Sequence, residues 1–136
     1  MKHLLDVNLL VAWGWSDHSE HQRTARWLGE MKGRRGVKLC TTPIVELGFI
    51  RVSVQRSGGR VALADAAKML GGMLAALGTR HEFIPDDLSP TGPWPKWCVG
   101  PSQSTDAHLL ALAVHHGGVL ATLDTGIPGA VVVGMA

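Results

Sequence analysis

Four acidic residues occur in sequence contexts where a carboxylate can do chemistry. Asp6 and Asp124 each follow a short apolar run, whereas Glu46 and Asp106 lie near the starts of predicted helices among apolar residues. Ligand crevices in open α/β sheets lie at the carboxyl ends of strands, and a buried carboxylate is costly unless it is paired or binds a metal. Carboxylates converging to about 4–6 Å repel one another, and a bound cation removes that repulsion. Because oxygen ligands select hard cations, the four acids predict a Mg²⁺ or Mn²⁺ site.

Each acid taken singly also has an ordinary structural interpretation. Asp6 and Asp124 could be turn residues, and Asp106 could favour a helix N-terminus through the helix dipole. Glu46 could form an ion pair with Arg51 or another base. The chain contains only 11 acidic residues, so the placement of all four together carries the hypothesis.

The histidine pairs give weaker signals for metal binding. His18 and His21 are spaced i, i+3 on a predicted helix and could ligate a transition metal. No third nitrogen or sulfur ligand is evident beside them, so we interpret them as surface or supporting residues. His115 and His116 are interpreted as a helix C-terminus that the helix dipole favours.

Length and composition favour one compact unit. A chain of 136 residues with 46% hydrophobic residues can bury one core, so we expect a single domain over 1–136. The net charge of +2 is too small to indicate nucleic-acid binding by electrostatics alone. Cys40 and Cys98 lack ligand spacing and fit reduced thiols. The first apolar run stops at Asp6, so neither a signal peptide nor a membrane span is expected, which predicts a cytoplasmic protein.

Short apolar runs alternate with helical patterns along the chain. Strands are predicted at 3–5, 37–41, 81–84, 119–123 and 131–133. Helices are predicted at 8–15, 18–32, 43–55, 61–77 and 104–116, with Ser16-Asp17 as an N-cap of the second. The segment 85–103 is rich in proline and predicts a long ordered loop. The alternation predicts an α/β fold with a parallel sheet covered on both faces.

Each of the four acids lies in a longer segment: L-L-D-V-N-L-L-V-A at 4–12, T-P-I-V-E-L-G-F-I-R-V at 42–52, S-T-D-A-H-L-L-A-L-A at 104–113 and L-A-T-L-D-T-G-I at 120–127. In this order, the segments resemble the first, second, third and fourth motifs of the PIN domains, specifically the VapC-like ribonuclease toxins of bacterial toxin–antitoxin pairs. The similarity spans nearly the whole chain in the family's order. It implies a PIN-like three-layer α/β/α sandwich with a mostly parallel sheet of about five strands.

The resemblance also implies roles for individual residues. Asp6 and Asp106 would be the principal metal ligands, and Glu46 and Asp124 would complete the acidic pocket directly or through waters. The supporting polar groups would be Asn8 and Thr122. The implied chemistry is hydrolysis of RNA phosphodiester bonds assisted by Mg²⁺ or Mn²⁺, with Glu46 or Asp124 orienting the attacking water or accepting its proton. The implied partners are a VapB-like antitoxin, an RNA substrate and a second copy in a homodimer.

Residues outside the motifs suggest where RNA could bind. Trp94, Lys96 and Trp97 could stack on unpaired bases and contact phosphate, or the tryptophans could pack on the core or a partner. A basic rim could come from Arg51, Arg56 and Arg60, for which solvated surface is the ordinary interpretation.

Two other functions are compatible with aspartates at strand ends. A phosphoacceptor or phosphatase of the doubly wound type also places Asp there, but it needs a lysine late in the chain, and Lys96 is the last. A non-catalytic PIN-like module that binds RNA or protein is the other alternative. Such a module would be expected to have lost some of the acids, and all four positions are filled here.

Overall fold

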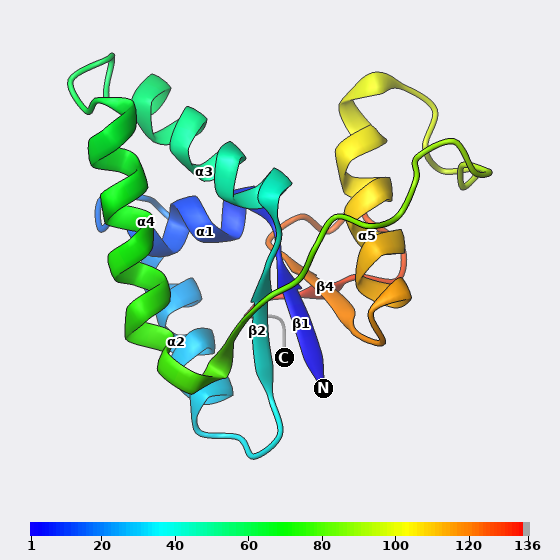
Figure 1. Cartoon of the computed structure of the whole chain (residues 1–136), viewed down its shortest axis with the longest axis horizontal. Helices are drawn as coiled ribbons and strands as arrows, with labels where there is room; N and C mark the ends of the chain where they lie inside the picture. The colour runs from blue at the N-terminus through cyan, green and yellow to red at the C-terminus, as the bar shows by residue number, and fades with distance from the viewer. Residues whose placement is uncertain (135–136) are drawn as a thin grey trace.

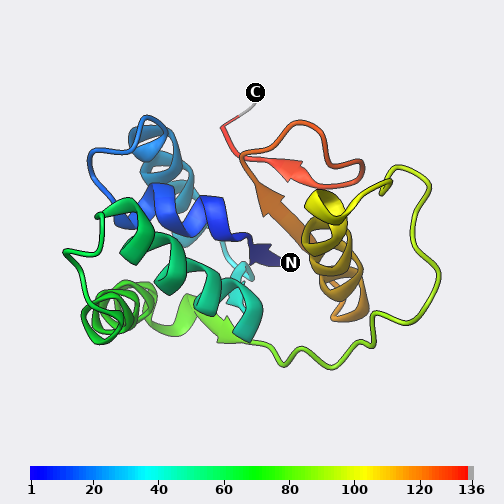
Figure 2. The same cartoon turned by 90° about the horizontal axis from the view of Figure 1, so that it is seen from above.

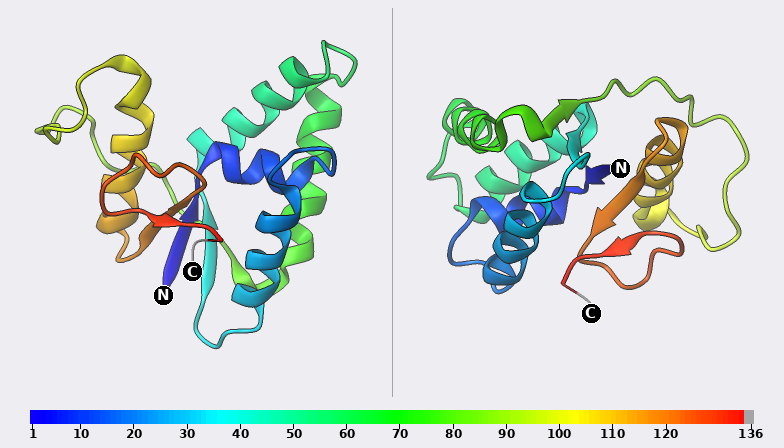
Figure 3. Two further views of the ribbon diagram at one scale, coloured as in Figure 1. Left: turned by 180° about the vertical axis from the view of Figure 1, so that it is seen from behind. Right: turned by 90° about the horizontal axis from the view of Figure 1, so that it is seen from below.

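The computed structural model describes residues 1–134 and is built on a parallel sheet. Five strands lie in the order β3-β2-β1-β4-β5, and every pair of neighbours is parallel. The strands are β1 (Lys2–Leu5), β2 (Lys38–Thr41), β3 (His81–Phe83), β4 (Val119–Thr122) and β5 (Val131–Val132). Figure 3 shows β5 as the outer strand beside β4. The predicted parallel sheet of about five strands is therefore confirmed.

Five α-helices cover the two faces of this sheet. They are α1 (Val7–Gly14), α2 (His21–Lys32), α3 (Pro43–Arg56), α4 (Leu63–Leu77) and α5 (Ser104–His115), with short 3₁₀ turns at Gly78–Arg80 and Pro101–Gln103. Figure 1 shows α1 to α4 grouped on one side of β1 and β2, and α5 on the other side. This arrangement is the predicted three-layer α/β/α sandwich. Within residues 1–134, none of the helices has the length and apolar character needed to cross a membrane.

The central strands are almost wholly buried, as expected for parallel strands covered on both faces. Leu4 and Leu5 of β1, Leu39 of β2 and Leu120 of β4 are each at most 1% exposed. Phe49 of α3 is fully buried in the same core. The sheet therefore forms a rigid base for the side chains that follow its carboxyl ends.

The start of α2 differs from its prediction. The helix begins at His21, and its N-cap residue is Glu20, so Ser16-Asp17 does not cap it. His18 instead accepts the Glu20 backbone N–H on Nδ1 at 3.0 Å, which holds a turn before the helix. The Asp17 carboxylate forms an ion pair with Arg56, whose guanidinium lies 3.0 Å from it. A long-range partner thus replaced the predicted local cap.

The segment 85–103 is irregular, as predicted, up to the 3₁₀ turn at Pro101–Gln103, and it passes around the outside of α5 (Figure 2). Its two tryptophans lie in different environments. Trp97 packs against the hydrophobic core, whereas the Trp94 side chain is 46% exposed. Trp94 lines a pocket together with Ile44 at the start of α3 and Ser104 and Thr105 at the start of α5. The loop therefore brings one aromatic side chain to the region where these two helices begin.

Candidate active site

Asp6 stands directly after β1, the central strand, and caps α1. The residue is 5% exposed, and its carboxylate accepts two hydrogen bonds: Oδ1 accepts the Leu9 backbone N–H at 2.9 Å, and Oδ2 accepts the Thr122 hydroxyl. The Asp6 backbone N–H also donates to the carbonyl of Ala121 in β4. The carboxylate is thus fixed in position by both neighbouring elements.

Thr122 joins Asp6 to the end of β4. Its hydroxyl donates to Asp6 and accepts the backbone N–H of Asp124 at 3.0 Å. Asp124 in turn closes a tight turn by accepting the Gly126 N–H on Oδ1 at 2.7 Å. Since β1 and β4 are hydrogen-bonded neighbours, this fully buried threonine connects the two strand ends that carry the aspartates.

Asp6, Asp106 and Asp124, here called the aspartate cluster, interact electrostatically. The pKa of Asp6 is raised to about 6, chiefly by burial and additionally by the charges of Asp106 and Asp124, while its hydrogen bonds from Thr122 and Leu9 lower it. Burial, followed by the charge of Asp124, also raises the pKa of Asp106, which lies in the first turn of α5. Three neighbouring carboxylates, two of which are hard to ionise, fit a hard divalent cation, because its charge offsets both desolvation and repulsion.

Glu46 follows the neighbouring strand, β2, and has a different set of partners. Its Oε2 accepts the hydroxyl of Thr41 at 2.7 Å, and the same hydroxyl lies 2.7 Å from Nε2 of His81. The ion pair with Arg51 that the sequence allowed is absent from residues 1–134, and Arg51 is exposed. The structure therefore couples the three aspartates electrostatically, whereas the contacts of Glu46 are with Thr41 and, through it, His81.

His81 was not predicted to belong to the site. Its pKa is lowered by burial, while the charge of Glu46 opposes that shift, so the ring is neutral at pH 7. Because the Thr41 hydroxyl donates its only proton to Glu46, it must accept the proton of His81 Nε2–H. The contact depends on β3 lying beside β2, which neither residue's local sequence reveals.

Asn8 lies on α1 and Gly48 lies on α3, the helices that begin after β1 and β2. Asn8, expected as a supporting group, lies exposed in the first turn of α1. Gly48 is buried where α3 approaches α1, and a Cβ at this position would lie 2.5 Å from Val7 Cγ2. A larger residue at position 48 would push apart the two helices that begin beside Asp6 and Glu46.

The predicted basic rim is only partly available for a ligand. Arg56 is occupied, because its guanidinium pairs with Asp17 and lies 5.4 Å from the ring centre of Trp15. Arg51 and Arg60 are exposed. A role for these two arginines stays a prediction.

A three-layer α/β/α sandwich with aspartates after two of its central strands fits a PIN-like domain and also other doubly wound folds, so the similarity to known proteins decides the family. No family model matches the chain. Ribonuclease VapC38 of Mycobacterium tuberculosis is 38% identical over 126 residues, which cover 91% of this chain and 86% of the relative. Ribonuclease VapC44 of the same species is 38% identical, covering 96% and 94%, and ribonuclease VapC39 is 36% identical, covering 93% and 91%. The chain therefore belongs to the VapC-like PIN-domain family.

Proposed function

We propose that this chain is a Mg²⁺- or Mn²⁺-dependent endoribonuclease and the toxin of a VapBC-type toxin–antitoxin pair. The observation that carries the proposal is the aspartate cluster, in which burial and mutual repulsion raise the pKa of Asp6 to about 6. A bound divalent cation would offset the burial and the repulsion of these carboxylates. The relatives' names, which all specify a ribonuclease, support RNA as the substrate.

The proposed roles follow from how each carboxylate is held. Mg²⁺ or Mn²⁺, when bound, lowers the pKa of a water molecule and offsets the charge on the phosphate. Asp6 and Asp106 are the principal ligands, and Asp124 completes the set from the end of β4. Asp6 is the most rigid of the three, because its two hydrogen bonds fix both oxygens. Rigid ligands preserve the geometry that the reaction needs.

Glu46 is the proposed base that orients the attacking water and accepts its proton. The hydroxyl of Thr41 occupies one carboxylate oxygen, Oε2, and leaves Oε1 to face the substrate. His81 keeps that hydroxyl directed at Glu46 by donating to it from Nε2. His81 and Thr41 are thus positioning residues, whereas Glu46 acts on the reacting water.

The exposed Trp94 is the proposed contact for an unpaired base of the RNA. It lines a pocket with Ser104 and Thr105, which directly precede Asp106 in the chain. Stacking on an aromatic ring tolerates any base and holds single-stranded segments. A loop or bulge of a structured RNA is therefore a better substrate than a continuous duplex.

The proposed partners are a VapB-like antitoxin and a second copy of the chain, and the proposed location is the cytoplasm. The antitoxin covers the acidic pocket and offers a basic side chain to its carboxylates. Exposed apolar side chains support association through the helical layer: Leu47 of α3 is 61% exposed and Leu63 of α4 is 65% exposed.

The decisive experiment is cleavage of a mixed pool of structured RNAs by purified protein. Reactions contain Mn²⁺ or a chelator, and the variants Asp6→Ala and Asp106→Ala are compared with Asp65→Ala, which removes an exposed acid on α4. Metal-dependent cutting that both cluster variants lose and the control keeps supports the proposal. Metal-dependent RNA binding without cutting by the unaltered protein contradicts it and favours a non-catalytic RNA-binding module.

A further inference from the structure

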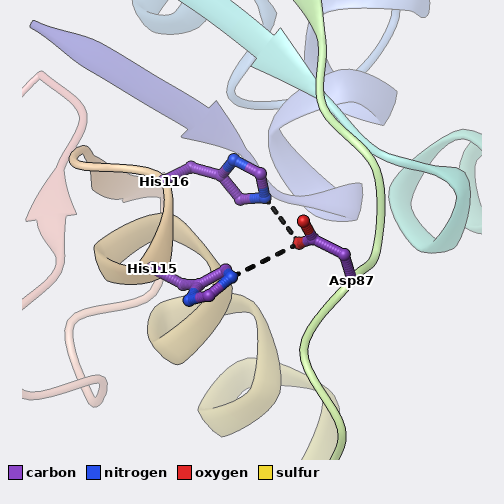
Figure 4. Close-up of side chains that lie close together, drawn as sticks. All are labelled: Asp87, His115 and His116. Carbon is purple, nitrogen blue, oxygen red and sulfur yellow. Dashed lines mark hydrogen bonds and ion pairs between the residues drawn. The ribbon is translucent and has the colours of Figure 1, made fainter.

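A second group of metal-type ligands lies apart from the aspartate cluster. It consists of Asp87, in the segment 85–103, together with His115, the last residue of α5, and His116, which follows it (Figure 4). One ligand atom from each residue lies within 4.8 Å of the other two. The group joins the irregular segment to the C-terminal end of α5.

The two imidazole rings converge on one carboxylate oxygen. Nε2 of His116 lies 2.7 Å and Nε2 of His115 lies 3.7 Å from Oδ1 of Asp87. Successive residues within a helix do not face each other. Convergence is possible here because the helix ends: His116 has φ −93° and ψ 12°, and Gly117 turns the chain away with φ 76°.

The spacing suits a small cation with nitrogen and oxygen ligands. Zinc–ligand bonds of about 2.0–2.2 Å place neighbouring atoms of a tetrahedral site about 3.3–3.6 Å apart. The two nitrogen–oxygen distances, 2.7 and 3.7 Å, lie on either side of that range, and modest side-chain rotation would equalise them. The side chains of Asp87 and His115 are each 46% exposed, so they are free to rotate and leave one side of the group open.

This group is separate from the aspartate cluster in position and in chemistry. Asp106 and His115 are nine residues apart on the same helix, which corresponds to roughly 14 Å along its axis at about 1.5 Å per residue. Two imidazoles and one carboxylate favour zinc or a similar transition metal, whereas three carboxylates favour Mg²⁺ or Mn²⁺.

We propose that Asp87, His115 and His116 bind a Zn²⁺ ion that fastens the segment 85–103 to the end of α5. A solvent molecule fills the fourth position. The ion stabilises the packing of the segment 85–103, which carries Trp94, against the C-terminal end of α5. The proposal does not depend on RNA cleavage, because it concerns a different ion at a different end of α5.

The test is a Zn²⁺ titration of the full chain without a histidine tag, in competition with a chromophoric chelator. Excess Mg²⁺ is present so that the aspartate cluster does not take up zinc. The unaltered protein should bind one equivalent. Asp87→Asn, His115→Asn and His116→Asn should each weaken binding by at least about 10-fold, since even removal of outer partners of metal ligands costs about 10–100-fold.

The matched control is His108→Asn. His108 lies on the same helix and pairs with Asp86, next to Asp87 in the chain, at the same distance of 2.7 Å, but it belongs to no three-ligand group in residues 1–134. The His108→Asn variant should bind zinc as the unaltered protein does. In both proteins, zinc should protect the segment 85–103 from limited proteolysis. Far-UV circular dichroism confirms that each variant is folded. No zinc uptake by the unaltered protein, or equal uptake by the three ligand variants, would show that the group is only a set of ion pairs.

Discussion

Asp6→Asn should make the metal-free protein more stable at neutral pH, although it alters a buried and hydrogen-bonded residue. Burial raises the pKa of this carboxyl from 3.8 to about 6. Below pH 3.8 it is protonated in both the folded and the unfolded chain and contributes nothing. As the pH rises from 3.8 through about 6, the unfolded chain ionises first, so folding stability is lost and stays lost at higher pH.

The expected gain follows from the size of this effect. One pKa unit corresponds to about 1.36 kcal/mol, so a rise from 3.8 to about 6 costs the folded protein about 3 kcal/mol. Asparagine keeps an oxygen for the Leu9 N–H but presents an amide to Thr122, and the disturbed hydrogen bond costs about 1 kcal/mol. The net gain is about 2 kcal/mol. For 136 residues this raises Tm by roughly 7 °C.

The assay is thermal unfolding of both proteins in chelator at pH 4 and pH 7.5, with Asp65→Asn as the control for loss of an exposed acid. The variant should exceed the unaltered protein at pH 7.5 and lose its advantage at pH 4. Saturating Mn²⁺ at pH 7.5 should raise the Tm of the unaltered protein more than that of the variant. A variant that is less stable at pH 7.5, or a difference that does not change with pH, would refute the reasoning.

Three further substitutions test the surroundings of the cluster. Gly48→Ala should destabilise the fold by about 1–3 kcal/mol in urea unfolding, because its Cβ meets Val7. Gly29→Ala, in open space on α2, is the control and should be stabilising. Equal effects of the two substitutions on the free energy of unfolding would contradict the packing argument. Thr122→Val should weaken Mn²⁺ binding by about 10–100-fold by calorimetry, with Thr122→Ser restoring it; unchanged affinity would separate this hydroxyl from the site. Trp94→Ala should raise KM for RNA about 5–150-fold with kcat unchanged, as loss of about 1–3 kcal/mol of stacking requires; a fall in kcat alone would exclude a stacking role.

The sheet and the aspartate positions could be predicted because they depend on local patterns and one general rule. Short apolar runs between helical patterns identify parallel strands, and the carboxyl ends of such strands meet at one edge. Asp6 and Asp124 follow two of these runs, and Asp106 lies at a helix start. The interaction among these three residues follows from strand order, which placed β1 beside β4.

The parts that could not be predicted depend on contacts between distant segments. The bridge from Glu46 to His81 requires β3 to lie beside β2, and no local pattern fixes that order. Asp87 meets His115 and His116 only because an irregular segment passes the end of α5, and no periodicity describes such a segment. From the sequence, the two histidines were therefore interpreted as a helix C-terminus, and their contact with the Asp87 carboxylate was not predicted.

The hydrogen bond between Thr122 and Asp6 also determines when a newly made chain can become active. The two residues are 116 positions apart, so Asp6 leaves the peptidyl-transferase centre roughly 6–23 seconds before Thr122 is added, at about 5–20 residues per second. Until then β4 is incomplete, and Asp6 lacks Thr122 and Asp124. For the proposed ribonuclease, the order of synthesis keeps the nascent chain harmless to its own messenger RNA and ribosome.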